Sequence, residues 1–214
     1  LQVIAIVTYS GADLLVYDAC FIVIIINQGL KKYGGDLAIG AFGIVNRLVF
    51  IVVMIVMGLN QGMQPIAGYN FGAKLYGRVN KVLRLTIIYA TAVTTFGFLV
   101  GMLVPDLVVG IFTSDAELTE LSVTGLRITV MFFPIIGFQM VTSNFFQSIG
   151  MAGKAIFLSL TRQMLILLPC LLVLPQFFGV AGVWYSMPVS DLLASLIALV
   201  MLVCQFRKFR TSPL

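Results

Sequence analysis

Six long apolar runs constrain the fold of this chain more than any other feature. They cover approximately residues 8–30, 37–59, 82–104, 121–147, 155–178 and 181–204. About 20 apolar residues cross the hydrocarbon core of a bilayer as a helix, and every run reaches that length. The runs lack the alternation of a transmembrane strand, and a helix pairs its own backbone groups inside lipid. The sequence therefore predicts an all-α membrane protein, with residues 1–214 forming a single lobe of six transmembrane helices.

The composition excludes a soluble enzyme or binding domain. Only 10% of the 214 residues are charged, against about 25% in soluble domains. The absence of His excludes imidazole-based catalysis and His-based metal sites. Cys20, Cys170 and Cys204 lie far apart in apolar runs, a pattern typical of buried free cysteines rather than disulfides. We therefore expect no enzyme activity, no cofactor, no metal site and no nucleic-acid partner, and the predicted partner is the lipid bilayer.

The distribution of basic residues predicts the orientation of the helices. Two basic residues, Lys31 and Lys32, lie on one predicted side, and nine lie on the other: Lys74, Arg78, Lys81, Arg84, Lys154, Arg162, Arg207, Lys208 and Arg210. Lys and Arg accumulate in cytoplasmic loops, so this asymmetry places the more basic side in the cytoplasm. Both ends of the segment are then cytoplasmic, and the acidic loop around Glu117 faces outward.

The basic segment after the second run admits two interpretations. Lys74, Arg78, Lys81 and Arg84 recur at helical spacing, and apolar residues fill the opposite face. The pattern fits an interfacial helix that rests on anionic lipid headgroups. It fits equally well a set of charges that only fixes the topology.

Prolines predict that the helices are irregular. Pro65, Pro134, Pro169 and Pro188 lie in or near the apolar runs. A proline lacks the backbone N–H and clashes with the preceding turn, so each is expected to kink or break its helix. Broken helices at membrane depth recur in transporters, although structural bundles contain them as well.

Three segments carry a resemblance to a known family. They read KKYGGDLAIGA at residues 31–41, GLNQGMQPIAGYNFGAK at residues 58–74 and FFQSIG at residues 145–150. The second segment, with Arg78 and Val79, resembles the signature that follows the eighth helix of the multidrug and toxic compound extrusion (MATE) family. The signature positions matched here are Gly58, Gln61, Gly62, Gln64, Pro65, Gly68 and Gly72.

The resemblance implies a transporter fold and activity. Members of this family have twelve helices in two six-helix lobes, and they export organic cations and other amphiphiles in exchange for Na⁺ or H⁺. This chain resembles the C-terminal lobe, which implies that the N-terminal lobe and small-molecule drugs are its partners. Because it begins at Leu1 rather than Met, we expect it to be a fragment. The implied location is the bacterial cytoplasmic (inner) membrane.

The coupling-ion site implied by the resemblance is incomplete in this chain. Some sodium-coupled members carry an acidic residue in the tenth helix, whereas residues 129–147 contain no Asp or Glu. Other members place the coupling acid in the first helix, which this chain lacks.

Ionisable residues inside the runs are candidates for the transport pathway, because a lone charge in hydrocarbon is costly. Asp18, Arg47 and Asp191 each lie ten residues into a run, which is about 15 Å of helix. We expect Asp18 and Arg47 to form an ion pair; the alternative is that Asp18 faces the cavity and attracts cations. Asp191 is interpreted as a satisfied polar position or a proton relay. Three amides are further candidates, either as substrate contacts or as links between helices: Asn46, Gln139 and Asn144.

The sequence leaves three functional hypotheses. The first is the C-terminal lobe of a cation-coupled multidrug antiporter that works by alternating access. The second is a lipid-linked saccharide flippase of the same superfamily, whose cavity is expected to be basic. The third is a non-transporting, half-size membrane protein.

The predicted topology can be measured by cysteine labelling. A Cys introduced near Arg78 is expected to react with a membrane-impermeant maleimide only from the cytoplasmic side, since that loop is the most basic. A Cys near Glu117 is expected to react only from outside. The reverse labelling pattern would contradict the predicted orientation.

Overall fold

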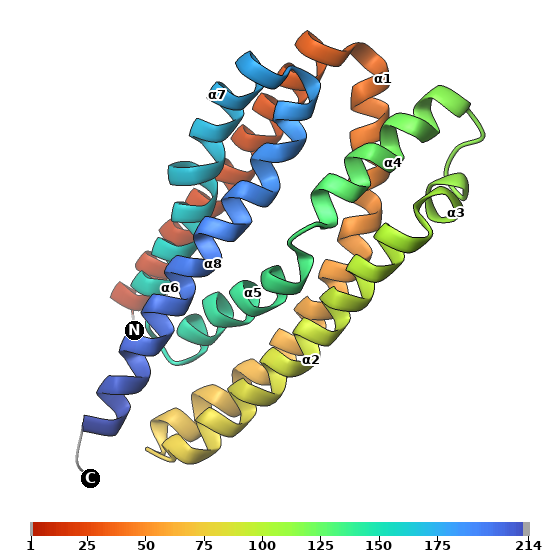
Figure 1. Cartoon of the computed structure of the whole chain (residues 1–214). Helices are drawn as coiled ribbons and strands as arrows, with labels where there is room; N and C mark the ends of the chain where they lie inside the picture. Colours follow the sequence, from red (N-terminus) through yellow and green to blue (C-terminus); the bar gives the residue numbers. More distant parts are fainter. Residues whose placement is uncertain (1, 212–214) are drawn as a thin grey trace.

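The computed structural model describes the backbone of residues 2–211 and the side chains of residues 21–206. All regular elements of this part of the chain are helical, which confirms the all-α prediction (Figure 1). In chain order they are α1 (Gln2–Gly72), α2 (Tyr76–Leu103), α3 (Pro105–Gly110), α4 (Ala116–Val130), α5 (Phe133–Ser148), α6 (Ala152–Leu160), the π-helix η1 (Thr161–Leu167), α7 (Leu168–Phe178) and α8 (Val180–Thr211).

Helix α1 consists of two legs that meet at Gly35. This residue has φ 66° and ψ −162°, a conformation that is non-helical and open only to glycine at low cost. Figure 1 shows the two legs of α1 running in opposite directions. The reversal separates the first two apolar runs, as the sequence predicts, but it needs one residue rather than the six between residues 30 and 37.

The second leg of α1 is longer than the apolar run that predicts it. The run ends near residue 59, whereas the helix continues to Gly72 and includes Pro65. Its polar extension still has an inward face, because Asn60, Met63 and Ala67 are buried. Met63 and Ala67 belong to the same hydrophobic cluster as residues of α2 and α5. The signature segment is therefore helical nearly throughout.

The basic segment is the beginning of α2 rather than a separate interfacial helix. A turn with Lys74 at φ 59° leads directly into α2 at Tyr76. The apolar residues Val79 and Leu83 are buried in the protein core beside Phe145 and Phe146 of α5, so this face does not lie on lipid. The role of the four basic residues as topology determinants stays a prediction.

Prolines interrupt the fourth and fifth runs. The axes of α4 and α5 differ by 54° at a break just before Pro134. In the fifth run, the π-helix η1 precedes Pro169 of α7. Proline cannot donate to the carbonyl four residues earlier and its ring clashes with that group, so a widened turn accommodates it.

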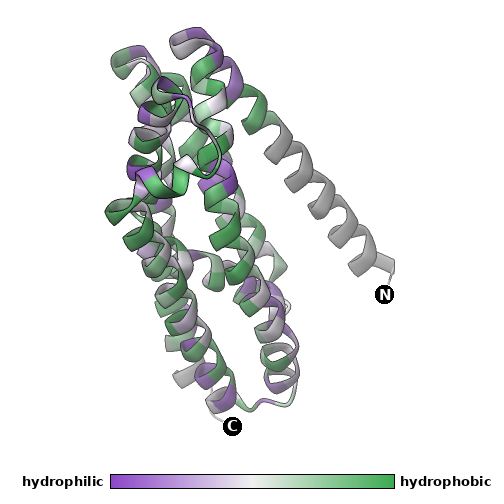
Figure 2. Ribbon diagram, turned by 90° about the vertical axis from the view of Figure 1, so that its right-hand side faces the viewer, coloured by the Kyte–Doolittle hydropathy of each residue, from purple (hydrophilic) through white to green (hydrophobic). Residues whose placement is uncertain are grey.

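The helices have the lengths and surfaces that a membrane requires. Four are long and apolar enough to cross it within the described residues, and the bent pair α4–α5 gives a fifth. Large apolar side chains such as Phe96 and Leu103 are exposed, 69% and 75% respectively. Figure 2 shows hydrophobic residues predominating along the lengths of the helices. The first of these helices contains the reversal at Gly35; six separate spans stay a prediction, because side chains before Phe21 lie outside the described residues.

The contact between α2 and α5 depends on Gly137. A Cβ at this position would lie 2.9 Å from the carbonyl oxygen of Ala90 and 2.7 Å from Oγ1 of Thr94. We expect Gly137→Ala to lower the free energy of unfolding by about 1–3 kcal/mol, since α2 must shift as a rigid backbone. Gly153→Ala is the matched control, because nothing lies within 4 Å of its added Cβ. Thermal unfolding in detergent measures both, and equal stabilities would contradict the close approach.

Candidate functional site

A cavity of about 520 Å³ lies between α1, α4, α5, η1 and α8. Its walls are mainly apolar, with aromatic and thioether side chains from Phe42, Phe50, Phe133, Met140 and Met187. The polar lining consists of six residues: Asn27, Asn46, Thr129, Arg162, Ser190 and Asp191. Such a cavity has the size of a small-molecule binding site, with a few polar groups that can orient a ligand.

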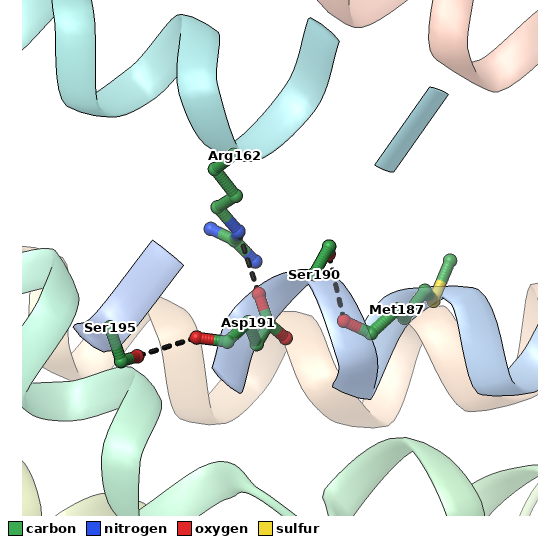
Figure 3. A network of polar contacts seen from close by, with 5 residues as sticks. All are labelled: Arg162, Met187, Ser190, Asp191 and Ser195. Atoms are coloured by element: carbon green, nitrogen blue, oxygen red, sulfur yellow. Dashed lines mark hydrogen bonds and ion pairs between the residues drawn. The ribbon is translucent and has the colours of Figure 1, made fainter. Parts of the chain in front are cut away.

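The charged residues of the cavity form an ion pair. Nε of Arg162 on η1 lies 2.7 Å from Oδ1 of Asp191 on α8 (Figure 3). The Asp191 side chain is 6% exposed, while that of Arg162 is 37% exposed. Removing a carboxylate from water costs several kcal/mol unless a counter-charge compensates it, and the guanidinium supplies that charge. The pair also links the fifth run to the sixth.

Serines on α8 satisfy the backbone around Asp191. Ser190 Oγ donates to the carbonyl of Met187 at 2.8 Å, and Ser195 Oγ donates to the carbonyl of Asp191 at 2.6 Å (Figure 3). These hydroxyls are therefore engaged with their own helix. The Asp191 carboxylate accordingly has Arg162, from another helix, as its charged partner.

Arg162 owes its position to the π-helix. The N–H of Leu168 donates to the carbonyl of Gln163, five residues earlier, in the wide turn that precedes Pro169. A π turn inserts one residue into the helical register and thereby rotates the side chains before it relative to those after it. Arg162 therefore lies within the helical part of the fifth run rather than in a loop. Subtracting it leaves eight basic residues against two, so the direction of the predicted topology is unchanged.

A second, more polar pocket of about 170 Å³ adjoins the cavity. Polar side chains of α5, α6 and η1 line it: Gln139, Ser143, Asn144, Ser159, Arg162 and Gln163. Oε1 of Gln139 is buried and has no hydrogen-bond partner among the described residues, and the residue is 5% exposed. Met140 and Arg162 line both the pocket and the cavity, so the two spaces share a wall.

The structure separates the predicted site residues into groups. Asn46 and Asp191 line the cavity, and Gln139 and Asn144 line the polar pocket. Arg47 is exposed, and it lines neither space. The side chain of Asp18 lies outside the described residues, so the Asp18–Arg47 pair stays a prediction.

Signature residues contact α5 rather than the cavity. Nε2 of Gln64 donates to Oδ1 of Asn144 at 3.3 Å, and Nδ2 of Asn144 donates to the carbonyl of Met140 at 2.9 Å. A Cβ on Gly68 would lie 2.9 Å from the carbonyl oxygen of Ser148, so only glycine permits this approach. These contacts give two signature positions a packing role. They also connect α1 to the helix that bears Gln139.

No group of three or more His, Cys, Asp and Glu side chains in the described part of the chain is arranged to hold a metal ion. Among the described residues, the charged side chains that line the cavity are Arg162 and Asp191. Sequence reasoning missed Arg162. The available signal was its position inside the fifth apolar run, seven residues before Pro169.

Comparisons with known proteins identify relatives of this chain. The model of the MatE family matches residues 15–172. The chain is 28% identical over 176 residues to the multidrug export protein MepA of Staphylococcus aureus (strain MSSA476), a match that covers 82% of this chain and 38% of the relative. It therefore spans well under half the length of that curated relative.

Solved structures of transporters share this fold, among them the following two. A ligand complex of the MATE multidrug transporter DinF-BH is 36% identical with a TM-score of 0.81, covering 94% of this chain and 45% of that chain. The second is an outward-facing conformation of a multidrug resistance MATE family transporter of the MOP superfamily. It has a TM-score of 0.86 at 17% identity, covers 94% of this chain and 46% of that chain, and supports the fold alone.

The ion pair predicts unequal effects of its two partners on stability. We expect Arg162→Met to lower the free energy of unfolding by about 2 kcal/mol or more, because it strands the buried Asp191 carboxylate. Asp191→Asn should cost less, since the partly exposed Arg162 side chain can turn toward water. Thermal unfolding in detergent checks both variants and the double variant, which should lose less than the sum of the singles.

Arg127→Met provides the control, because Arg127 is exposed and lines neither space. Strictly additive losses in the double variant would show that Arg162 and Asp191 do not stabilise each other.

Proposed function

Because this chain belongs to the MATE family of multidrug efflux transporters, we propose that it forms the C-terminal lobe of an exporter of amphipathic, often cationic compounds. The observation that carries the proposal is the cavity of about 520 Å³, with Asp191 in an otherwise mainly apolar wall. The covered share of the relatives, 38% and 45%, is what one of two similar lobes would give. The chain's place in the whole transporter is part of this proposal.

The cavity chemistry supports a range of amphipathic substrates. Phe42, Phe50 and Phe133 offer flat apolar surface, and the thioethers of Met140 and Met187 adapt to different shapes. Asp191 is the acidic residue that lines the cavity in the described part of the chain, so it supplies the negative charge that a cationic group seeks. Asn27 and Asn46 offer amides for hydrogen bonds.

The transport cycle that we propose is alternating access. Two lobes rock around a midplane cavity, and entry of Na⁺ or H⁺ drives the export of the drug. The other lobe is the N-terminal six-helix unit, which would complete the cavity. The proposed site is the bacterial cytoplasmic membrane, with both ends of this segment in the cytoplasm. Helix α5 has no Asp or Glu, and among the described residues Asp191 is the acid of the cavity that could hold the coupling ion.

The flippase alternative has weaker support. A lipid-linked saccharide carries pyrophosphate, so its cavity needs excess positive charge. Arg162 is the basic residue that lines the cavity in the described part, and its charge is compensated by Asp191. The described lining of the cavity is therefore close to neutral, which suits amphiphiles better than a polyanion.

Efflux measurements on the protein at its natural full length test the proposed function. We expect Asp191→Asn to reduce efflux of a lipophilic cation such as tetraphenylphosphonium by about tenfold or more, since the variant loses the opposing charge. Efflux of a neutral amphiphile should change little. Asp106→Asn is the matched control, because Asp106 on α3 is exposed and does not line the cavity. Unchanged cation efflux in Asp191→Asn, at normal protein levels, would contradict the proposed role.

A further inference from the structure

Arg162 stands between two spaces of different chemistry. Its guanidinium contacts Asp191 in the cavity, and the same side chain lines the polar pocket between α5, α6 and η1. The arginine cannot lose its charge at any physiological pH, so it always requires acceptors. Its side chain is 37% exposed, against 6% for Asp191, which leaves room for the arginine, rather than the acid, to move.

The polar pocket has the acceptors that a guanidinium requires. Five side chains with oxygen atoms line it: Gln139, Ser143, Asn144, Ser159 and Gln163. Oε1 of Gln139 is buried without a partner among the described residues, and a buried acceptor of this kind gains free energy from a charged donor. A guanidinium has five N–H donors in a planar fork, enough to engage several of these oxygens together.

We propose that Arg162 is an internal substitute for the transported cation. While the site is empty of substrate, the guanidinium neutralises Asp191. A cationic group that enters the cavity takes its place at the carboxylate, and the Arg162 side chain turns into the polar pocket, where Gln139 accepts its hydrogen bonds. The inference rests on the proposed function, because it requires a cation to reach Asp191.

This exchange alters which helices are held together. In the unloaded state, the ion pair ties η1 to α8. In the loaded state, hydrogen bonds from Arg162 tie η1 to α5, the helix that bears Gln139 and that receives the Gln64–Asn144 contact from α1. Cation binding thus replaces a contact of η1 with α8 by a contact of η1 with α5. A neutral substrate would leave the ion pair intact, so the exchange of Arg162 distinguishes cationic from neutral ligands.

The experiment measures binding of two probes to the full-length protein in detergent. Tetraphenylphosphonium is the cation, and triphenylphosphine oxide is a neutral compound with three of the same rings. We expect Gln139→Leu to weaken tetraphenylphosphonium binding by about tenfold, because a charge-assisted hydrogen bond is lost in the loaded state alone. Binding of the neutral probe should stay within about twofold. The melting temperature without ligand should be unchanged or higher, since Oε1 of Gln139 is unpartnered there.

The decisive measurement repeats Gln139→Leu in an Arg162→Gln background. There the substitution should change tetraphenylphosphonium binding by less than about twofold, because no guanidinium remains to move. Gln147→Leu is the matched control: it makes the same change on the same helix at an exposed position that lines neither space.

Three results would overturn the exchange. If Gln139→Leu weakens cation binding equally in both backgrounds, Gln139 contacts the ligand itself. If it weakens both probes and lowers the ligand-free melting temperature, its role is structural. If the wild-type protein binds neither probe, the proposed function fails and the exchange fails with it, so the two failures are distinguishable.

Discussion

The low dielectric of the bilayer governs this structure, because polar groups buried there must find partners inside the protein. Helices meet the requirement for the backbone, and interruptions are confined to a few places. Two of these lie beside the cavity: the bend before Phe133 and the π-helix that bears Arg162. Irregular backbone at membrane depth is tolerable where it is buried in protein or lines a cavity. The two proline-associated breaks therefore coincide with the region where ligand chemistry is concentrated.

The same constraint explains the arrangement of the charges. Asp191 would be costly alone, so its counter-charge comes from a neighbouring helix while nearby serines bond to their own backbone. The result is a cavity with two opposite charges and a mostly apolar wall. The Arg162–Asp191 ion pair joins η1 to α8, which few other polar contacts connect. A competing cation can break this ion pair, and the charge of a ligand is thereby coupled to helix packing.

The apolar runs were sufficient to predict helices, because only a helix or a closed barrel satisfies its backbone in lipid. They did not predict that α1 continues to Gly72, since Asn60 and Gln64 lower the hydropathy although one helical face remains buried. Depth counted along a run places Arg47 and Asp191 alike, yet one is exposed and the other buried. Depth does not report which face of a helix meets a neighbour.

The partner of Asp191 was not predictable from periodicity. Arg162 lies where one extra residue per turn shifts the helical register, so a spacing of 3.6 residues points its side chain in the wrong direction. The count of basic residues used to predict topology contains a second error, because it treats Arg162 as a loop charge although Arg162 is paired with Asp191. The acid was found from sequence because an acidic residue inside an apolar run is rare. The arginine was not, because its position near the start of a run resembles that of an ordinary topology signal.

The single-residue reversal at Gly35 has a counterpart at Gly179, where φ is 58° between α7 and α8. The two reversals pack together, since a Cβ on Gly34 would lie 2.7 Å from a methyl group of Val180. Both lie at the end of the bundle that also carries the connection between α3 and α4 (Figure 1). Neither reversal forms an extended loop to which an antibody or nanobody could bind. A binder for this end of the lobe would therefore contact exposed helical turns, such as those of Lys31 and Lys32, together with residues 111–115, where the chain leaves the helices.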